Sequence, residues 1–223
     1  MRFLLKALKL GGLSLHRRTL PLLAFLLMSA FAMTADTISS NLSNVTAGTE
    51  TASGSTWLTA SFGTDSSSSS LSNVTLLLSN PTAGIAEVDL YSNSLLQPSS
   101  LVGILTSPGS YSSGLSNTTF SSSGLALSAN STYWIVLKAL SGEFDWAWTT
   151  DSSGTGTGFQ GTWGSSTDAG STWYTYAVYP TQFSVTTTAA TVTPEPGTGL
   201  LGITGLLVGV IVLYKKQRTQ TES

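Results

Sequence analysis

The sequence predicts an all-β fold, an antiparallel, jelly-roll-like β-sandwich that occupies residues 33–186. Three observations lead to this prediction. Short runs rich in β-branched and aromatic residues recur along this stretch, and Gly, Pro, Asn and Ser separate them. No segment of it has apolar residues at helical spacing. Because helices do not alternate with the strands, an antiparallel sheet is expected rather than a parallel one.

Two segments carry the clearest strand patterns. Residues 86–91 alternate between apolar side chains on one face and mostly acidic ones on the other, which is the period of a half-buried strand. Residues 133–137 form an unbroken apolar run, which predicts a central strand covered on both faces. Further strands are expected at residues 56–62, 71–79, 101–106, 115–120, 143–149, 172–179 and 182–188.

The remaining segments are expected to be loops. Residues 80–84 read Asn-Pro-Thr-Ala-Gly, which predicts a turn because Pro fixes φ and Gly tolerates positive φ. Residues 36–55 are polar and threonine-rich and should lead into the first strand, and residues 65–70 are a serine run. Residues 187–193 read as a Thr/Ala linker.

The absence of two residue types limits the chemistry of the chain. There is no cysteine, and the only histidine is His16, near the start. Residues 33–193 therefore cannot build Ser-His-Asp or Cys-His catalytic groups, nor an ordinary zinc site. No disulfide is available either, so the stability of the domain must come from its packed core.

The charge of the same stretch is strongly one-sided. Residues 33–193 hold nine acidic residues and one base, Lys138, which gives a net charge of 1 − 9 = −8. Such a domain repels phosphate backbones, so no nucleic-acid partner is expected.

Two carboxylate pairs lie on predicted strands, Glu87 with Asp89 and Glu143 with Asp145. Each pair projects from one side of its strand. Glycosidases use two carboxylates, about 5–5.5 Å or about 6.5–9.5 Å apart, to cleave a sugar bond. Oxygen ligands of this kind also suit calcium, although no Asp-x-Asp-x-Asp-Gly loop is present and no cofactor is expected. The plainer interpretation, which we favour, is a solvated strand face.

Tryptophans and tyrosines offer a second kind of candidate site. Aromatic rings combine a flat apolar face with a polar tip, so exposed ones can stack on sugars. Core packing is the expected role of most of them. Trp163 lies among glycines in Gly161-Thr162-Trp163-Gly164 and is the tryptophan expected to be exposed.

Residues 1–32 have the pattern of an export signal. Basic residues precede an apolar run at residues 20–31, and Ala30-Phe31-Ala32 is a small-x-small site for signal peptidase. Cleavage is expected after Ala32, with Ala35 as the alternative. The basic residues are Arg2, Lys6, Lys9, Arg17 and Arg18.

The C-terminal segment has three parts. Pro194-Glu195-Pro196 cannot continue a helix and should be extended. The uncharged run 197–214 is just long enough to span a bilayer as a helix. Lys215, Lys216 and Arg218 follow it and should hold residues 219–223 in the cytoplasm.

This tripartite segment resembles the PEP-CTERM sorting signal of Gram-negative bacteria. The resemblance implies that an exosortase-like membrane protease recognises the tail in the inner membrane and cleaves near residues 194–196. It also implies a link to exopolysaccharide and biofilm. The alternative is an ordinary single-pass anchor.

The domain between the two segments is similar to the choice-of-anchor families of β-rich bacterial surface domains. The residues that carry this similarity are Leu71-Ser-Asn-Val-Thr-Leu-Leu-Leu-Ser, Val88-Asp-Leu-Tyr and Leu127-Ser-Ala-Asn-Ser-Thr-Tyr-Trp-Ile-Val-Leu. No catalytic residues transfer from these families. The expectation is thus a non-enzymatic protein of the cell surface or extracellular matrix with a structural or adhesive role. The alternative is a secreted glycosidase or carbohydrate-binding module.

Overall fold

The computed structural model describes residues 35–189, and in this range the chain is all-β and antiparallel, with no helix. The expected fold class is confirmed at this level. The predicted export signal, the sorting motif and the predicted span at 197–214 lie outside the described residues. Among residues 35–189, no helix has the length and apolar character that a membrane crossing requires.

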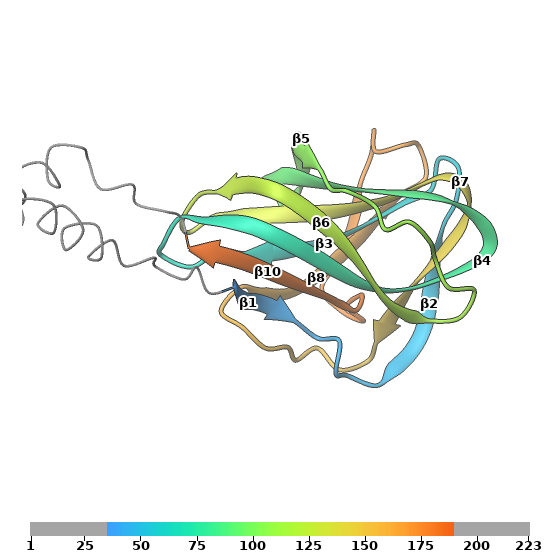
Figure 1. The fold of residues 1–223 in the computed structure, drawn as a ribbon, viewed down its shortest axis with the longest axis horizontal. Helices are drawn as coiled ribbons and strands as arrows, with labels where there is room; N and C mark the ends of the chain where they lie inside the picture. Colours follow the sequence, from blue (N-terminus) through green and yellow to red (C-terminus); the bar gives the residue numbers. More distant parts are fainter. Residues whose placement is uncertain (1–34, 190–223) are drawn as a thin grey trace, which may run out of the picture. The chain divides into compact units, whose positions relative to one another are not determined.

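The ten strands are named in chain order (Figure 1). They are β1 (Ala35–Ser40), β2 (Thr46–Ala52), β3 (Trp57–Gly63), β4 (Ser69–Ser94), β5 (Gln97–Ile104), β6 (Ser116–Leu127), β7 (Thr132–Thr149), β8 (Phe159–Ser166), β9 (Tyr174–Tyr176) and β10 (Phe183–Ala189).

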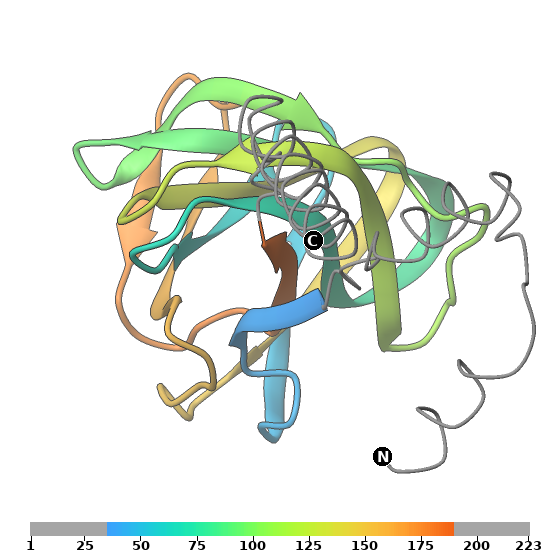
Figure 2. The ribbon, with the colours of Figure 1, turned by 60° about the vertical axis from the view of Figure 1, so that its left-hand side comes forward.

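All ten strands belong to one hydrogen-bonded sheet in the order β1-β10-β4-β7-β3-β8-β9. Strands β5 and β6 pair with β4, and β2 pairs with β7. The long strand β4 changes partners halfway: its first half pairs with β10 and β6, and its second half with β7 and β5. Figure 2 shows the strands curving around a common interior. The two long strands β4 and β7 therefore connect the two parts of the sheet.

The change of partners takes place where we predicted a turn, and that prediction is wrong. Residues 80–84 stay within β4, while the register against β7 shifts on both sides of Thr82. A side chain on Gly84 would place its Cβ 1.9 Å from the carbonyl oxygen of Ser141. Gly142, opposite, has a φ of +69°. The two glycines allow the backbones to approach closely, so the irregularity becomes a bulge between paired strands instead of a reversal.

The core lies between the two parts of the sheet and draws side chains from both. All five residues of the apolar run 133–137 are buried, which confirms the predicted central strand. The rings of Phe159 in β8 and Phe183 in β10 lie 6.3 Å apart, although these strands are not neighbours in the sheet. The largest fully buried side chains include Trp134, Trp146, Phe62, Phe120, Phe144 and Phe183.

Several predicted boundaries need correction. The polar segment 36–55 is no simple lead-in, because it contains β1 and β2. Asn41, which is buried, fastens the turn between them: its side chain donates to the Thr181 carbonyl oxygen and accepts from the Phe183 amide. Thr187 and Thr188 were predicted both as the end of the strand 182–188 and as the start of the linker, and Ala189 as linker; all three belong to β10, which pairs with β1 and β4. Strand β8 was not predicted at all.

Candidate functional site

The acidic residues predicted on β4 form an ion-paired cluster with Lys138. Lys138 of β7 lies directly opposite Glu87 of β4 in the antiparallel register. Its Nζ donates to Oε1 of Glu87 at 3.1 Å and contacts Oδ2 of Asp89. The side chains of Lys138, Glu87 and Asp89 are 11%, 27% and 0% exposed. A solvated strand face was the favoured interpretation, and it is wrong for Asp89.

Burial and charge act against each other in this cluster. Burial raises the pKa of Asp89, and the hydrogen bond and charge of Lys138 only partly offset the effect. Burial lowers the pKa of Lys138, but hydrogen bonds to Asp89 and Glu87 leave it above its ordinary value. The second carboxyl oxygen of Asp89, Oδ1, is buried and has no hydrogen-bond partner among residues 35–189.

Aromatic side chains cover the cluster. The ring of Trp57 in β3 lies 4.5 Å from Lys138 Nζ, and the ring of Tyr91 lies 5.9 Å from it. Cations are attracted to aromatic faces at these distances. The loop after β8 covers Trp57 in turn, because a Cβ on Gly170 would lie 2.7 Å from the indole ring. The amine and the carboxyl group of Asp89 are therefore largely shielded from water, while Glu87 remains partly exposed.

The second carboxylate pair lies elsewhere along β7 and is solvent-facing. Glu143 is exposed, and its Oε2 accepts from the Thr82 hydroxyl at 3.3 Å. Asp145 is half-buried and accepts from the Thr51 hydroxyl at 2.6 Å. Glu143 pairs with Thr82 and Lys138 with Glu87, so the two carboxylate pairs occupy different parts of the β4–β7 ladder.

The tryptophans divide evenly between the interior and the surface. Trp134, Trp146 and Trp173 are buried, and Trp57, Trp148 and Trp163 are half-buried. Trp163 is thus less exposed than expected: its Nε1 donates to the Val178 carbonyl oxygen, and its ring lies 5.0 Å from that of Tyr176. Trp163 and Tyr176 form one of the two aromatic pairs that the described residues place at the surface.

The second surface pair is formed by Trp148 and Tyr179, whose rings lie 5.6 Å apart. The indole of Trp148 lies against Gly48 of β2, where a Cβ would come within 2.5 Å of the ring. Tyr179 is 51% exposed and Tyr176 43% exposed. We call the four residues of the two surface pairs, Trp148, Trp163, Tyr176 and Tyr179, the aromatic strip.

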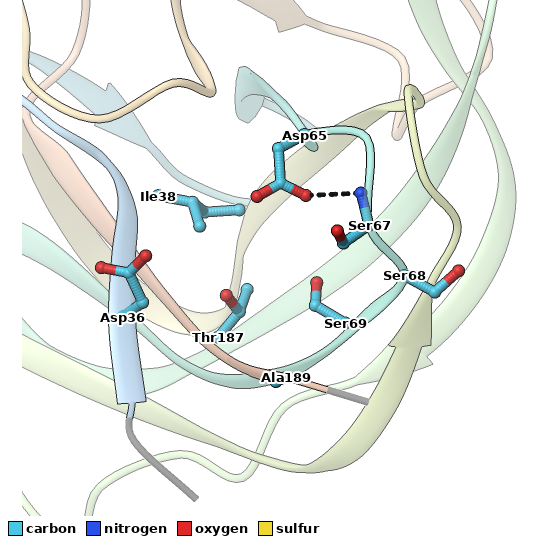
Figure 3. A pocket seen from close by; sticks show the side chains of 8 residues that line it. All are labelled: Asp36, Ile38, Asp65, Ser67, Ser68, Ser69, Thr187 and Ala189. Atoms are coloured by element: carbon cyan, nitrogen blue, oxygen red, sulfur yellow. Dashed lines mark hydrogen bonds between the residues drawn. The ribbon is translucent and has the colours of Figure 1, made fainter. Parts of the chain in front are cut away.

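A shallow pocket of about 270 Å³ lies where the described chain begins and ends (Figure 3). Asp36 of β1 and Asp65 of the β3–β4 loop lie on opposite sides of it. Asp65 accepts from the amide of Ser67 at 2.9 Å. Among residues 35–189, no group of three or more acidic side chains is arranged to hold a metal ion.

Lys138 is the residue of the candidate site that the sequence pattern did not single out. The signal was present, because it is the only base in a domain of nine acids and sits next to an apolar run. No local pattern, however, shows that residue 138 meets residues 87 and 89.

No protein-family model matches the chain, and no curated protein matches it. Its function must therefore be inferred from its own residues.

Proposed function

We propose that this protein is exported to the cell surface or extracellular matrix and has a structural or adhesive role there. Residues 1–32 act as its signal peptide. Residues 194–218 act as a PEP-CTERM-like sorting signal that holds the protein in the inner membrane, through the span at 197–214, until an exosortase-like protease cuts near Pro194-Glu195-Pro196. The domain between them is a jelly-roll-like β-sandwich in contact with exopolysaccharide.

One structural observation supports this proposal most directly. Strands β1 and β10 are antiparallel neighbours, with Ala35 opposite Thr188 (Figure 1). The chain therefore enters and leaves the folded domain at one edge. A domain attached in this way keeps the loops of its opposite edge free, including the connections near Thr149 and Pro180, which are joined by a backbone hydrogen bond. This arrangement is compatible with a surface module tethered through its C-terminal segment.

The sandwich assignment is supported by the division of β4 and β7 between two sets of partners. The core between the two parts gives the domain a stable interior without disulfides. The nine acidic residues of residues 33–193 suit a surface that must remain soluble outside the cell.

The test uses the full chain in a bacterial host that carries an exosortase. Replacement of Pro194, Glu195 and Pro196 by alanine should leave the tail uncut and the protein in the membrane fraction. A matched variant, Thr191→Ala/Thr193→Ala, should be processed as the parent is. Release of the alanine variant at the parent's rate would contradict the sorting proposal. Normal matrix and surface properties in a deletion strain would contradict the structural or adhesive role.

The aromatic strip favours a second candidate function, binding of polysaccharide. Aromatic rings combine a flat apolar face, which can stack on a sugar ring, with a polar edge that can bond its hydroxyl groups. If the strip binds glycans, Trp148→Ala and Trp163→Ala should each weaken retention of the protein in polysaccharide gels. Tyr174→Ala is the matched control, because Tyr174 is 58% exposed and has no ring partner in the described part of the chain. Failure of the parent protein to bind any glycan would remove this candidate.

A glycosidase is the enzymatic version of that candidate. Asp89 is completely buried and ion-paired, so it offers no open side to a sugar. Glu143 and Asp145 are more accessible. Turnover of a polysaccharide by the parent, lost in Glu143→Gln or in Glu87→Gln, would establish the enzyme. No turnover by the parent would remove it.

A further inference from the structure

Lys138 is in an unusual position for the only base of an acidic domain. Lysine is almost never buried unless it is paired, since its amine loses hydration. Here the amine meets two carboxyl groups in the middle of the sheet, and one of them, Asp89, is inaccessible to solvent. Replacing such a buried ion pair by neutral groups is often neutral or stabilising. This domain instead places an amine and a carboxyl group in direct contact.

The register of the strands explains how three reactive groups converge. Lys138 lies opposite Glu87, and Asp89 is two residues further along the same face of β4. A long side chain reaches such a diagonal neighbour. The nitrogen of Lys138 therefore contacts the carboxyl group of Asp89 and at the same time donates to Glu87 at 3.1 Å. One amine, one carboxyl group to be attacked and one carboxyl group to move protons are within hydrogen-bond reach.

We infer that Lys138 and Asp89 react to form an intramolecular amide bond between β7 and β4, with Glu87 as the catalytic residue that transfers the protons. In the reactive state, the Lys138 amine is neutral and the Asp89 carboxyl group is protonated. The Nζ lone pair attacks Cγ of Asp89 and forms a C–N bond. Glu87 accepts a proton from the attacking nitrogen and delivers it to one carboxyl oxygen. The C–O bond breaks and one water molecule leaves, with no oxidant or reductant required.

Burial reduces the advantage of the ion pair over the neutral reactants, which differ from it by one proton along an existing hydrogen bond. Burial raises the pKa of Asp89 and favours its neutral acid, whereas hydrogen bonds to Asp89 and Glu87 raise the pKa of Lys138 and favour its charged form. The amine therefore becomes neutral by passing its proton to Asp89 along the hydrogen bond that joins them. The ring of Trp57, at 4.5 Å from Nζ, limits the access of water to the amine.

Proximity lowers the barrier of the reaction. Groups held in contact react as though at an effective concentration of about 10⁵–10⁸ M, which speeds the step relative to the same reaction between separate molecules in water. Both reacting residues lie on strands with neighbours on either side, so folding itself fixes their geometry. No separate enzyme is needed.

The bond would join the two longest strands of the domain at residues 49 apart in the sequence. It would also remove the cost of burying the charge of Asp89, whose Oδ1 has no hydrogen-bond partner in the described part of the chain. A chain without cysteine would thereby gain a covalent cross-link. This inference does not depend on the sorting signal or on the ligand of the domain.

The test is the mass of the full-length protein after its termini are identified by peptide sequencing. The parent should be lighter than its calculated mass by one water molecule. After denaturation, trypsin should leave the chain uncut at residue 138, and a chymotryptic digest should contain one branched peptide that joins residues 89 and 138. A parent of full mass, cut by trypsin at Lys138, would overturn the proposal whatever the variants do.

Variants assign the roles of the three residues. Lys138→Arg and Asp89→Ala should have full mass because each lacks one reactant. Glu87→Gln should lose most or all of the cross-link, whereas Glu143→Gln, a carboxylate on the same ladder outside the cluster, should retain it. A Glu87→Gln protein that is cross-linked as fast as the parent would overturn the role of Glu87.

Discussion

The cost of an unpaired charge at Asp89 can be measured by comparing two variants that cannot form an amide bond. In Lys138→Met, the buried Asp89 carboxylate loses the one cationic partner that it has among the described residues. In Lys138→Met/Asp89→Asn, the same shape is kept and the charge is removed. Loss of one member of a buried ion pair costs about 3–5 kcal/mol, because the other charge stays buried. That is a large part of the roughly 5–15 kcal/mol that stabilises a typical domain.

At pH 7, the single variant should therefore unfold at a lower temperature than the double variant. A domain of this size loses about 2–4 °C for each kcal/mol, so the expected difference is about 6–20 °C. Thermal unfolding followed by circular dichroism measures it. Equal melting temperatures for the two variants would refute the reasoning, since they would mean that Asp89 carries no buried charge.

The difference in stability between the single and the double variant should depend on pH. Burial raises the pKa of Asp89 even with Lys138 present, and the loss of Lys138 removes the interactions that lower it. The folded-state pKa of the single variant thus lies above the unfolded value, so the folded state binds the proton more tightly. Its stability relative to the double variant should rise as the pH falls through the folded-state pKa. A difference in melting temperature between the two variants that stays constant from pH 7 to pH 4 would contradict this expectation.

Three further predictions concern the fold and the cross-link. Gly142→Ala should lower the free energy of unfolding, measured with urea, by about 3 kcal/mol or more, because Gly142 has a φ of +69° and a Cβ there would lie 2.3 Å from a backbone oxygen. Gly109→Ala is the control and should change the free energy of unfolding little, because a Cβ at Gly109 would have no atom within 4 Å in the described structure. Asn41→Ala should cost about 2–3 kcal/mol, since it leaves buried backbone groups of β10 and its preceding loop unpaired; a cost near zero would show that water replaces the side chain. Glu87→Gln should lose the cross-link, which closes a loop of 49 residues, and should therefore lower the free energy of unfolding by about 4 kcal/mol and the melting temperature by about 8–16 °C. An unchanged melting temperature would argue against the bond.

The strands that the sequence predicts best are those with strong side-chain patterns. The run 133–137 has no polar interruption, so only a strand covered on both faces could contain it, and the structure agrees. Strands β1, β2 and β8 are rich in Ser, Thr and Gly and have no such pattern. They are held by backbone pairing with strands distant in the sequence, which no local signal reveals.

The same limit applies to the residues of the cluster. Alternation at residues 86–91 correctly places Glu87 and Asp89 on one face of β4. It does not show what covers that face. Trp57, Lys138 and the loop that contains Gly170 come from other parts of the chain, and together they turn a face expected to be wet into a buried one. The turn expected at residues 80–84 failed for a related reason, because Gly84 and Gly142 jointly permit a bulge between two long strands.

The most direct test of the proposed sorting is the determination of both termini of the mature protein, purified separately from membranes and from the medium. The proposal predicts an N-terminus just after Ala32 or Ala35 and a C-terminus near Pro194-Glu195-Pro196 in the surface or released form. A protein that keeps its tail to Ser223 and is found only in membranes would contradict it, and would identify an ordinary anchored surface domain instead.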